Sequence, residues 1–253
     1  MFDLFLTSAM AEAGEAVEAA AETVAETAAQ PESWLSNAFG KFGSFPVWGW
    51  IVVGILLVLG VILFSFSRQQ NGKKVWTTQM ISVGAICMAL SSVLSLIRLF
   101  RMPMGGSITP ASMLPLLLFA YVYGAGPGVS LGIIYGVMQF ILDGGEFAWA
   151  GLLPNLLDYP LGFGMLGLCG LFGSMKDDRR GLIIGVVVGC LGRFLCSFLS
   201  GWIFYGEYAP EGMSPLIYAA AYNGAFMGVE CIICVVLTVL VGAQLVRQLR
   251  RVK

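Results

Sequence analysis

Long apolar runs alternate with short polar segments along most of the chain. The runs cover residues 47–66, 75–97, 113–123, 129–142, 152–172, 182–204 and 216–245. A transmembrane helix needs about 20 mainly apolar residues to cross the hydrocarbon core, and several runs reach that length. The pattern predicts an all-α integral membrane protein, in which an additional transmembrane helix at 47–67 precedes a six-helix membrane domain at 75–253.

Residues 1–46 differ in composition from the rest of the chain. They are rich in Ala and Glu, and glutamates recur at steps of three and four residues, at Glu15, Glu18, Glu22 and Glu26. This spacing is typical of a surface helix with an acidic stripe, which Pro31 would end. The opening MFDLFLTSAMA is too short for a signal peptide and lacks a basic start. We therefore expect an acidic extracellular segment.

The composition supports a membrane location and excludes several kinds of chemistry. Hydrophobic residues make up 58% of the chain and charged residues 11%, whereas soluble domains carry about 25% charged residues. Histidine is absent, which removes histidine-based acid–base catalysis and histidine metal ligands. The six cysteines form no CxxC motif, so we expect small buried side chains. Without a GxxxxGK[ST] motif we expect no ATP site, and we predict neither catalysis nor a cofactor.

The basic residues predict how the helices are oriented. Most of them fall on one side of the membrane if every apolar run crosses it: Lys73, Lys74, Lys176, Arg179, Arg180, Arg247, Arg250, Arg251 and Lys253. Positively charged loops are cytoplasmic in membrane proteins. We therefore expect the N-terminus outside and the C-terminus in the cytoplasm. The acidic and aromatic segment at 205–212 then faces outward.

Small residues recur at helical spacing in several runs. Gly128, Gly132 and Gly136 form a GxxxGxxxG pattern, which lets helix backbones approach closely in lipid. Ala85 and Ala89 form an AxxxA pattern in the run at 75–97. This second pattern fits packing within the bundle, and it equally fits a docking face for another membrane subunit.

Three charged residues lie within apolar runs. A charge at the centre of a membrane costs about 2.5–3.5 kcal/mol, so such residues are candidates for function. Arg193 and Glu230 lie at similar depths and have opposite signs, so they either pair or line a pocket. Asp158 lies about two turns inside its run, where it suits a cationic ligand or a salt bridge to a loop arginine.

Polar and aromatic side chains accompany Asp158 in the outer halves of neighbouring runs. Ser197, Tyr218 and Asn223 would all lie at this level. Aromatic rings stack on positive heterocycles, and a buried carboxylate supplies the complementary charge. The combination predicts a pocket for a small aromatic cation.

Three segments resemble a known family. GGSITPASMLPLLLFAYVYGAGPG, LLDYPLGFGMLGLCGLFG and GRFLCSFLSGWIFYGEY…IYAAAYNG resemble the thiamine-specific substrate-binding (S) component of energy-coupling factor transporters, the ThiT/YuaJ family. The resemblance covers residue 75 to the C-terminus. It implies a six-helix membrane protein that binds thiamine near its outer face. In that family the first helix docks on a transmembrane coupling subunit, which two cytoplasmic ATPases drive.

The resemblance also implies roles for individual residues. Asp158 would face the thiazolium cation with Tyr159 beside it, and Asn223 would be the amide on the pyrimidine side. Tyr205 and Tyr218 match the family's aromatic ring positions, and Ala85 and Ala89 match its docking face.

The chain departs from the family pattern at the first outer loop and at one contact in the pocket. Ser197 stands where some members place a histidine, and GGSITP replaces a loop that carries Trp and Glu. We expect Ser107 and Thr109 to donate hydrogen bonds there, and Trp149 to supply a stacking ring.

The sequence therefore predicts the S component of a thiamine importer in the bacterial plasma membrane. Its expected partners are thiamine, the coupling subunit, the two ATPases and the lipid bilayer, with no nucleic acid. Two alternatives remain open. One is an S component for another vitamin or a thiamine precursor. The other is a stand-alone proton-coupled carrier, in which Glu230 would be the proton site.

Overall fold

The computed structural model describes residues 76–102, 106–142, 152–175, 178–210 and 212–252. The predicted acidic segment and the additional helix at 47–67 lie outside these residues. The described elements are α4 (Thr78–Leu96), β1 (Phe100–Arg101), β2 (Ser107–Ile108), α5 (Leu114–Tyr123), α6 (Ala125–Leu142), α7 (Leu152–Leu156), η4 (Leu157–Leu161), α8 (Gly162–Met165), η5 (Leu166–Phe172), α9 (Asp178–Phe204), η6 (Gly206–Tyr208), α10 (Pro215–Leu237), η7 (Thr238–Gly242) and α11 (Ala243–Val252).

Four of the described helices are long and apolar enough to cross a membrane: α4, α6, α9 and the continuous run from α10 to α11. Their outward faces carry large apolar side chains, among them Ile86, Ile134, Ile232 and Leu240. In water such a surface would be unfavourable, whereas in lipid it needs no cover. The described chain is therefore an all-helical membrane protein, as the apolar runs predicted.

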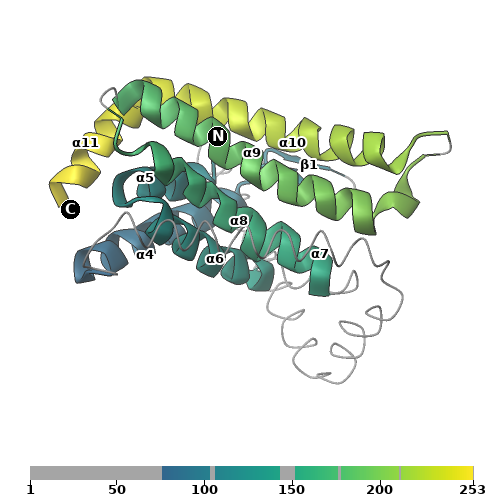
Figure 1. Cartoon of the computed structure of the whole chain (residues 1–253), viewed down its shortest axis with the longest axis horizontal. Coiled ribbons are helices and arrows are strands. Elements are labelled where there is room, and N and C mark those ends of the chain that lie inside the picture. Colours follow the sequence, from purple (N-terminus) through teal and green to yellow (C-terminus); the bar gives the residue numbers. More distant parts are fainter. Residues whose placement is uncertain (1–75, 103–105, 143–151, 176–177, 211, 253) are drawn as a thin grey trace, which may run out of the picture.

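The longest helices, α9 and α10, run antiparallel side by side along the molecule (Figure 1). Arg179 and Arg180 stand at the start of α9, and Tyr205 follows its last residue. Because α9 has 27 residues, these two groups are about 40 Å apart along the helix axis. The arginines and the aromatic segment therefore lie at opposite ends of the bundle.

Helix α5 occupies the centre of the fold. Each of its 10 residues is buried. It is hydrophobic on every side because other helices surround it, and at about 15 Å it is too short to span the hydrocarbon core. The runs predicted at 113–123 and 129–142 are separated by less than their bounds indicated: Gly124, at φ 98°, ends α5, and α6 begins directly at Ala125. A left-handed backbone of this kind favours glycine.

The run at 152–172 is broken into four short helices rather than one span. Pro160 lies inside the π-helical turn η4, where its missing N–H removes a regular helical hydrogen bond. This broken segment packs closely on α6. A Cβ atom at Gly132 would lie 2.3 Å from the backbone oxygen of Phe163, and one at Gly136 would lie 2.4 Å from that of Tyr159. The predicted glycine face is thus a backbone-to-backbone contact.

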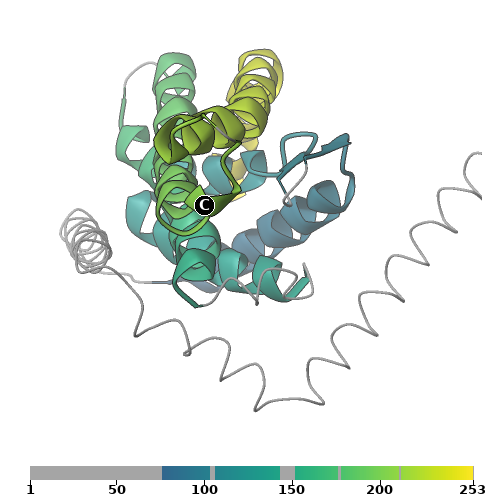
Figure 2. The same cartoon turned by 90° about the vertical axis from the view of Figure 1, so that its right-hand side faces the viewer.

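A short hairpin connects α4 to α5, in the segment interpreted from the sequence as a loop. Strand β1 pairs antiparallel with β2, and Phe100 lies opposite Ile108. The hairpin lies beside α4 at the edge of the bundle (Figure 2), and β2 also contacts α10. This places its backbone over the space between α4 and α10.

Candidate functional site

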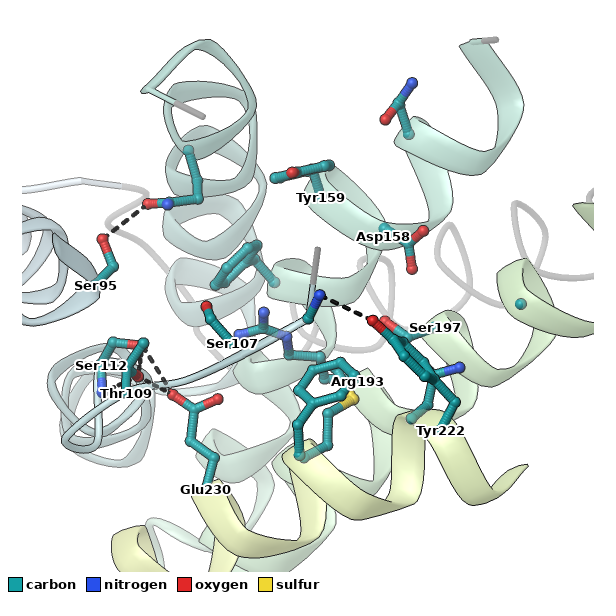
Figure 3. Close-up of a pocket in the computed structure, with 18 of the residues that line it drawn as sticks. Ser95, Ser107, Thr109, Ser112, Asp158, Tyr159, Arg193, Ser197, Tyr222 and Glu230 are labelled. Atoms are coloured by element: carbon teal, nitrogen blue, oxygen red, sulfur yellow. Dashed lines mark hydrogen bonds between the residues drawn. The ribbon is translucent and has the colours of Figure 1, made fainter. Parts of the chain in front are cut away.

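A cavity of about 180 Å³ lies among the hairpin, α6, the broken segment, α9 and α10 (Figure 3). One water molecule needs roughly 10–15 Å³ of such space, so the cavity has room for a small organic molecule. Apart from Met227, its side-chain lining is mainly polar, charged and aromatic: Ser95, Arg98, Ser107, Thr109, Ser112, Tyr135, Gln139, Asn155, Asp158, Tyr159, Phe163, Arg193, Ser197, Tyr205, Tyr218, Tyr222, Asn223, Phe226 and Glu230.

Asp158 supplies a carboxylate from the π-helical turn η4. Ser200, which is fully buried on α9, donates a hydrogen bond of 2.6 Å to its Oδ2 atom. Arg193 is close enough to interact electrostatically with the same carboxylate. Short hydrogen bonds to a charged acceptor are strong, so α9 fixes the position of this acid.

Aromatic rings form one wall of the cavity. Tyr218, Tyr222 and Phe226 are spaced four residues apart and therefore share one face of α10. The ring centroids of Tyr218 and Tyr222 are 5.9 Å apart, and those of Tyr222 and Phe226 are 5.8 Å apart. Tyr205 follows the last residue of α9 and also lines the cavity. Burial raises the pKa of its phenol, and the Asp158 carboxylate raises it further, so the phenol stays neutral at physiological pH.

Glu230 lies at the other end of the cavity and is 3% exposed. The hydroxyls of Thr109 and Ser112 both donate to its Oε1 atom, the latter at 2.9 Å. These donors precede α5, so Glu230 ties the segment after the hairpin to the middle of α10 (Figure 3).

The hairpin is attached to α10 a second time. The backbone N–H of Gly106 donates to the hydroxyl of Tyr222 at 3.1 Å. A Cβ atom at Gly106 would lie 2.9 Å from the ring of Phe226. The hairpin backbone therefore sits directly against the aromatic wall and closes one side of the cavity.

The structure brings most of the predicted site residues together. Asp158, Tyr159, Ser197, Tyr205, Tyr218 and Asn223 all line the cavity. Trp149 lies outside the described residues. Whether the six lining residues bind a ligand stays a prediction.

Arg193 and Glu230 both line the cavity, and no ion pair joins them within the described part of the chain. Arg193 instead lies over the ring of Phe163, with its guanidinium carbon 3.8 Å from the ring centroid. Of the loop residues expected to donate hydrogen bonds, Thr109 does so toward Glu230, and Ser107 lines the cavity.

Ala85 and Ala89 lie away from the cavity on the exposed side of α4. The side of α4 that packs into the bundle carries Val83, Gly84, Cys87 and Ser91. Ala85 and Ala89 therefore do not pack within the described bundle, which was one of the two interpretations of the alanine pattern.

Several lining residues escaped the sequence interpretation, including Tyr135, Gln139, Asn155 and Tyr222. Tyr222 could have been found, because it follows Tyr218 by one helical turn. Gln139 gave a weaker signal, as a single amide on an otherwise apolar helix. It accepts a hydrogen bond of 3.3 Å from Ser95, which joins α6 to α4.

Comparisons with known proteins give a consistent result. The family model described as thiamine transporter protein (Thia_YuaJ) matches residues 81–249. The thiamine transporter ThiT of Bacillus subtilis is 31% identical over 164 residues, which are 60% of this chain and 84% of that protein. The thiamine transporter ThiT of Lacticaseibacillus paracasei is 29% identical over 123 residues, which are 44% of this chain and 61% of that protein.

A solved structure of ThiT from Listeria monocytogenes has a similar fold, with a TM-score of 0.54 and 22% sequence identity. The match covers 68% of this chain and 96% of the solved chain. The family match confirms the resemblance seen in the sequence, and it confirms a transporter rather than an enzyme. Since the family model covers more than half of the chain, the chain belongs to the Thia_YuaJ family of thiamine transporter proteins.

Proposed function

We propose that this chain is the substrate-binding membrane subunit of an energy-coupling factor importer and captures thiamine in the cavity beside α9 and α10. The observation that carries the proposal is the meeting of the Asp158 carboxylate with the rings of Tyr159, Tyr205, Tyr218 and Tyr222 around one cavity. Thiamine carries a flat, permanently positive thiazolium ring. Aromatic faces attract such a cation, and a desolvated carboxylate complements its charge.

A thiamine titration tests this assignment. Binding of thiamine to the purified protein is followed by tryptophan fluorescence, for the wild type and for Asp158→Asn. A charge-assisted contact contributes about 1.5–3 kcal/mol, so the variant should bind roughly 10- to 150-fold more weakly. Glu207→Gln is the matched control, because Glu207 is an exposed acid that does not line the cavity. Unchanged affinity of Asp158→Asn would remove this residue from the site.

Competition binding separates thiamine from its precursors. Hydroxymethylpyrimidine lacks the thiazolium cation, so it should displace thiamine poorly. If it displaced thiamine at similar concentrations, a precursor would be the better substrate assignment.

Coupling to the ATPases is proposed to occur through Ala85 and Ala89. Both alanines are exposed on α4, the first helix of the described bundle, where a small-residue face allows a second helix to approach closely. Ala85→Trp or Ala89→Trp should preserve thiamine binding and abolish both co-purification with the coupling subunit and thiamine uptake. Ile134→Trp, at an exposed position on α6, is the control. Uptake that persists without a coupling subunit would favour the stand-alone carrier.

In the proposed orientation, the four described helices that are long enough to cross the membrane place the C-terminus in the cytoplasm. The arginines at the start of α9 and along α11 support it, because they lie at the opposite end from Tyr205. In intact cells, a membrane-impermeant thiol reagent should label Glu207→Cys and not Arg251→Cys. The reverse labelling would invert the orientation.

A further inference from the structure

The Glu230 carboxylate uses only half of its hydrogen-bonding capacity within the described chain. Both hydroxyl donors, Thr109 and Ser112, bind the same oxygen, Oε1. A carboxylate offers acceptor sites on both of its oxygens. No described residue donates to Oε2, although Glu230 is almost fully buried and lines the cavity. A buried charge is costly when its acceptors are left unfilled, so Oε2 calls for a donor in the cavity.

Whereas Glu230 carries an acceptor that lacks a donor in the described part of the chain, Arg193 carries hydrogen-bond donors that lack an acceptor there. Its Nε and Nη1 atoms are shielded from solvent and donate to no acceptor in the described residues. The side chain lines the same cavity and is held over the Phe163 ring. The guanidinium therefore has a fixed place and N–H groups without an acceptor. Together, Glu230 and Arg193 offer one acceptor and one set of donors at the same end of the cavity (Figure 3).

The position of this pair relative to the rest of the site indicates what it contacts. Glu230 lies seven residues beyond Asn223 on one face of α10, about 10.5 Å further from the outer end. Asp158 and the tyrosine rings lie between the outer end and the pair. A ligand whose cation lies beside Asp158 would thus extend its other ring toward Arg193 and Glu230. In thiamine that ring is a pyrimidine with an amino group next to a ring nitrogen.

We propose that Glu230 and Arg193 recognise the amino-substituted edge of the ligand's pyrimidine. Glu230 Oε2 accepts a hydrogen bond from the amino group, and the Arg193 guanidinium donates to the adjacent ring nitrogen. Thr109 and Ser112 hold Glu230 in place by binding its other oxygen. This assignment rests on the proposed function and adds two residues that determine specificity.

Oxythiamine provides the probe, because it carries a carbonyl oxygen in place of the amino group and a ring N–H in place of the acceptor nitrogen. The carbonyl oxygen of oxythiamine would then face the acceptor Oε2 of Glu230. Its ring N–H would face the donors of Arg193. We expect the wild type to bind thiamine at least 10-fold more tightly than oxythiamine. Glu230→Gln keeps an oxygen for Thr109 and Ser112 and turns an amide donor toward the cavity. The preference for thiamine should therefore shrink at least 10-fold in this variant.

Both ligands are titrated against wild type, Glu230→Gln and the control Glu207→Gln, and thermal unfolding verifies that each protein is folded. If Glu230→Gln does not fold, Arg193→Lys serves instead, since it retains the charge and loses the Nε donor. Equal affinity of the wild type for both ligands, or a preference unchanged in the folded variant, would overturn the inference. Absence of thiamine binding to the wild type would refute the proposed function as well, whereas binding with an unchanged preference would refute the inference alone.

Discussion

Two helix contacts on opposite sides of the broken segment are built in different ways. On one side, α6 meets this segment through glycines, and backbone atoms touch directly at Gly132 and Gly136. On the other side, the part of α9 that carries Arg193 and Ser197 faces this segment across a cavity, which Asn223 of α10 also lines. Lipid gives no hydrophobic driving force for association of helices, so stability has to come from close packing and hydrogen bonds.

The difference separates stability from binding within one fold. The glycine contact leaves no room for a ligand. It fixes the backbone of Tyr159, the residue that follows Asp158 in the chain. At the cavity contact, the Nε and Nη1 atoms of Arg193 donate to no acceptor in the described residues, so they are available to a ligand. Substitutions at the first contact should mainly affect folding, whereas those at the second should mainly affect affinity.

The largest effect is expected for Gly132→Ala. The new Cβ atom would lie 2.3 Å from the backbone oxygen of Phe163, which cannot move without shifting the broken segment. Overpacking of this kind costs about 3 kcal/mol, so thermal unfolding in detergent should occur at a clearly lower temperature. Gly228→Ala is the control, because nothing lies within 4 Å of its Cβ position. If both variants unfolded at the wild-type temperature, the close contact at α6 would be wrong.

The sequence predicted this side of the molecule well. The spacing of Gly128, Gly132 and Gly136 is a local pattern, and its consequence in lipid does not depend on which helix is the partner. The break at Pro160 was not predicted, because a proline in an apolar run is equally compatible with a kinked helix. The extent of the run at 152–172 was right, while its division into short helices depends on contacts with α6 and α9.

The site was predicted through types of residue rather than through contacts. Charges and amides in apolar runs are costly, which drew attention to Asp158, Asn223 and Glu230. Whether Arg193 and Glu230 pair could not be derived from the sequence, and in the structure Glu230 binds hydroxyls from a distant loop instead. The hairpin was missed for a related reason. Its strands are two residues long and depend on tertiary contacts with Tyr222.

A second prediction concerns the link between the loop and Glu230. Thr109→Val removes the hydroxyl that donates to Glu230 and accepts from the backbone N–H of Ser112 at 3.3 Å. Hydrogen bonds to a charged group contribute about 1.5–3 kcal/mol, so we expect a loss of about 2 kcal/mol in the free energy of unfolding. Thr109→Ser retains the hydroxyl and should restore most of the stability. Equal destabilisation by both substitutions would instead point to the lost methyl group or shape.

A smaller effect is expected where the hairpin touches the aromatic wall. Tyr222→Phe removes the hydroxyl that accepts from the Gly106 N–H and leaves the ring in place. A neutral hydrogen bond contributes about 0.5–1.5 kcal/mol, so thiamine should dissociate roughly 2- to 10-fold faster in stopped-flow measurements. Tyr218→Phe lies one turn away on the same face and is the matched control. Identical dissociation rates for the two variants would show that this bond does not hold the hairpin over the cavity.

The smallest effect concerns Tyr205 at alkaline pH. Burial and the neighbouring Asp158 carboxylate raise the pKa of this phenol in the folded protein, whereas an unfolded tyrosine titrates near pH 10. Below about pH 10 the neutral phenol is present in both states, and its contribution to stability is complete. As the pH rises further, the unfolded chain loses this proton first, so stability falls.

Tyr205→Phe should remove this loss, which amounts to less than about 1 kcal/mol near pH 10.5. Unfolding curves of the wild type and the variant should therefore run parallel between pH 7 and 9 and converge or cross above pH 10. Curves that stay parallel up to pH 11 would show that the phenol is solvated, and that the cavity is open around Tyr205.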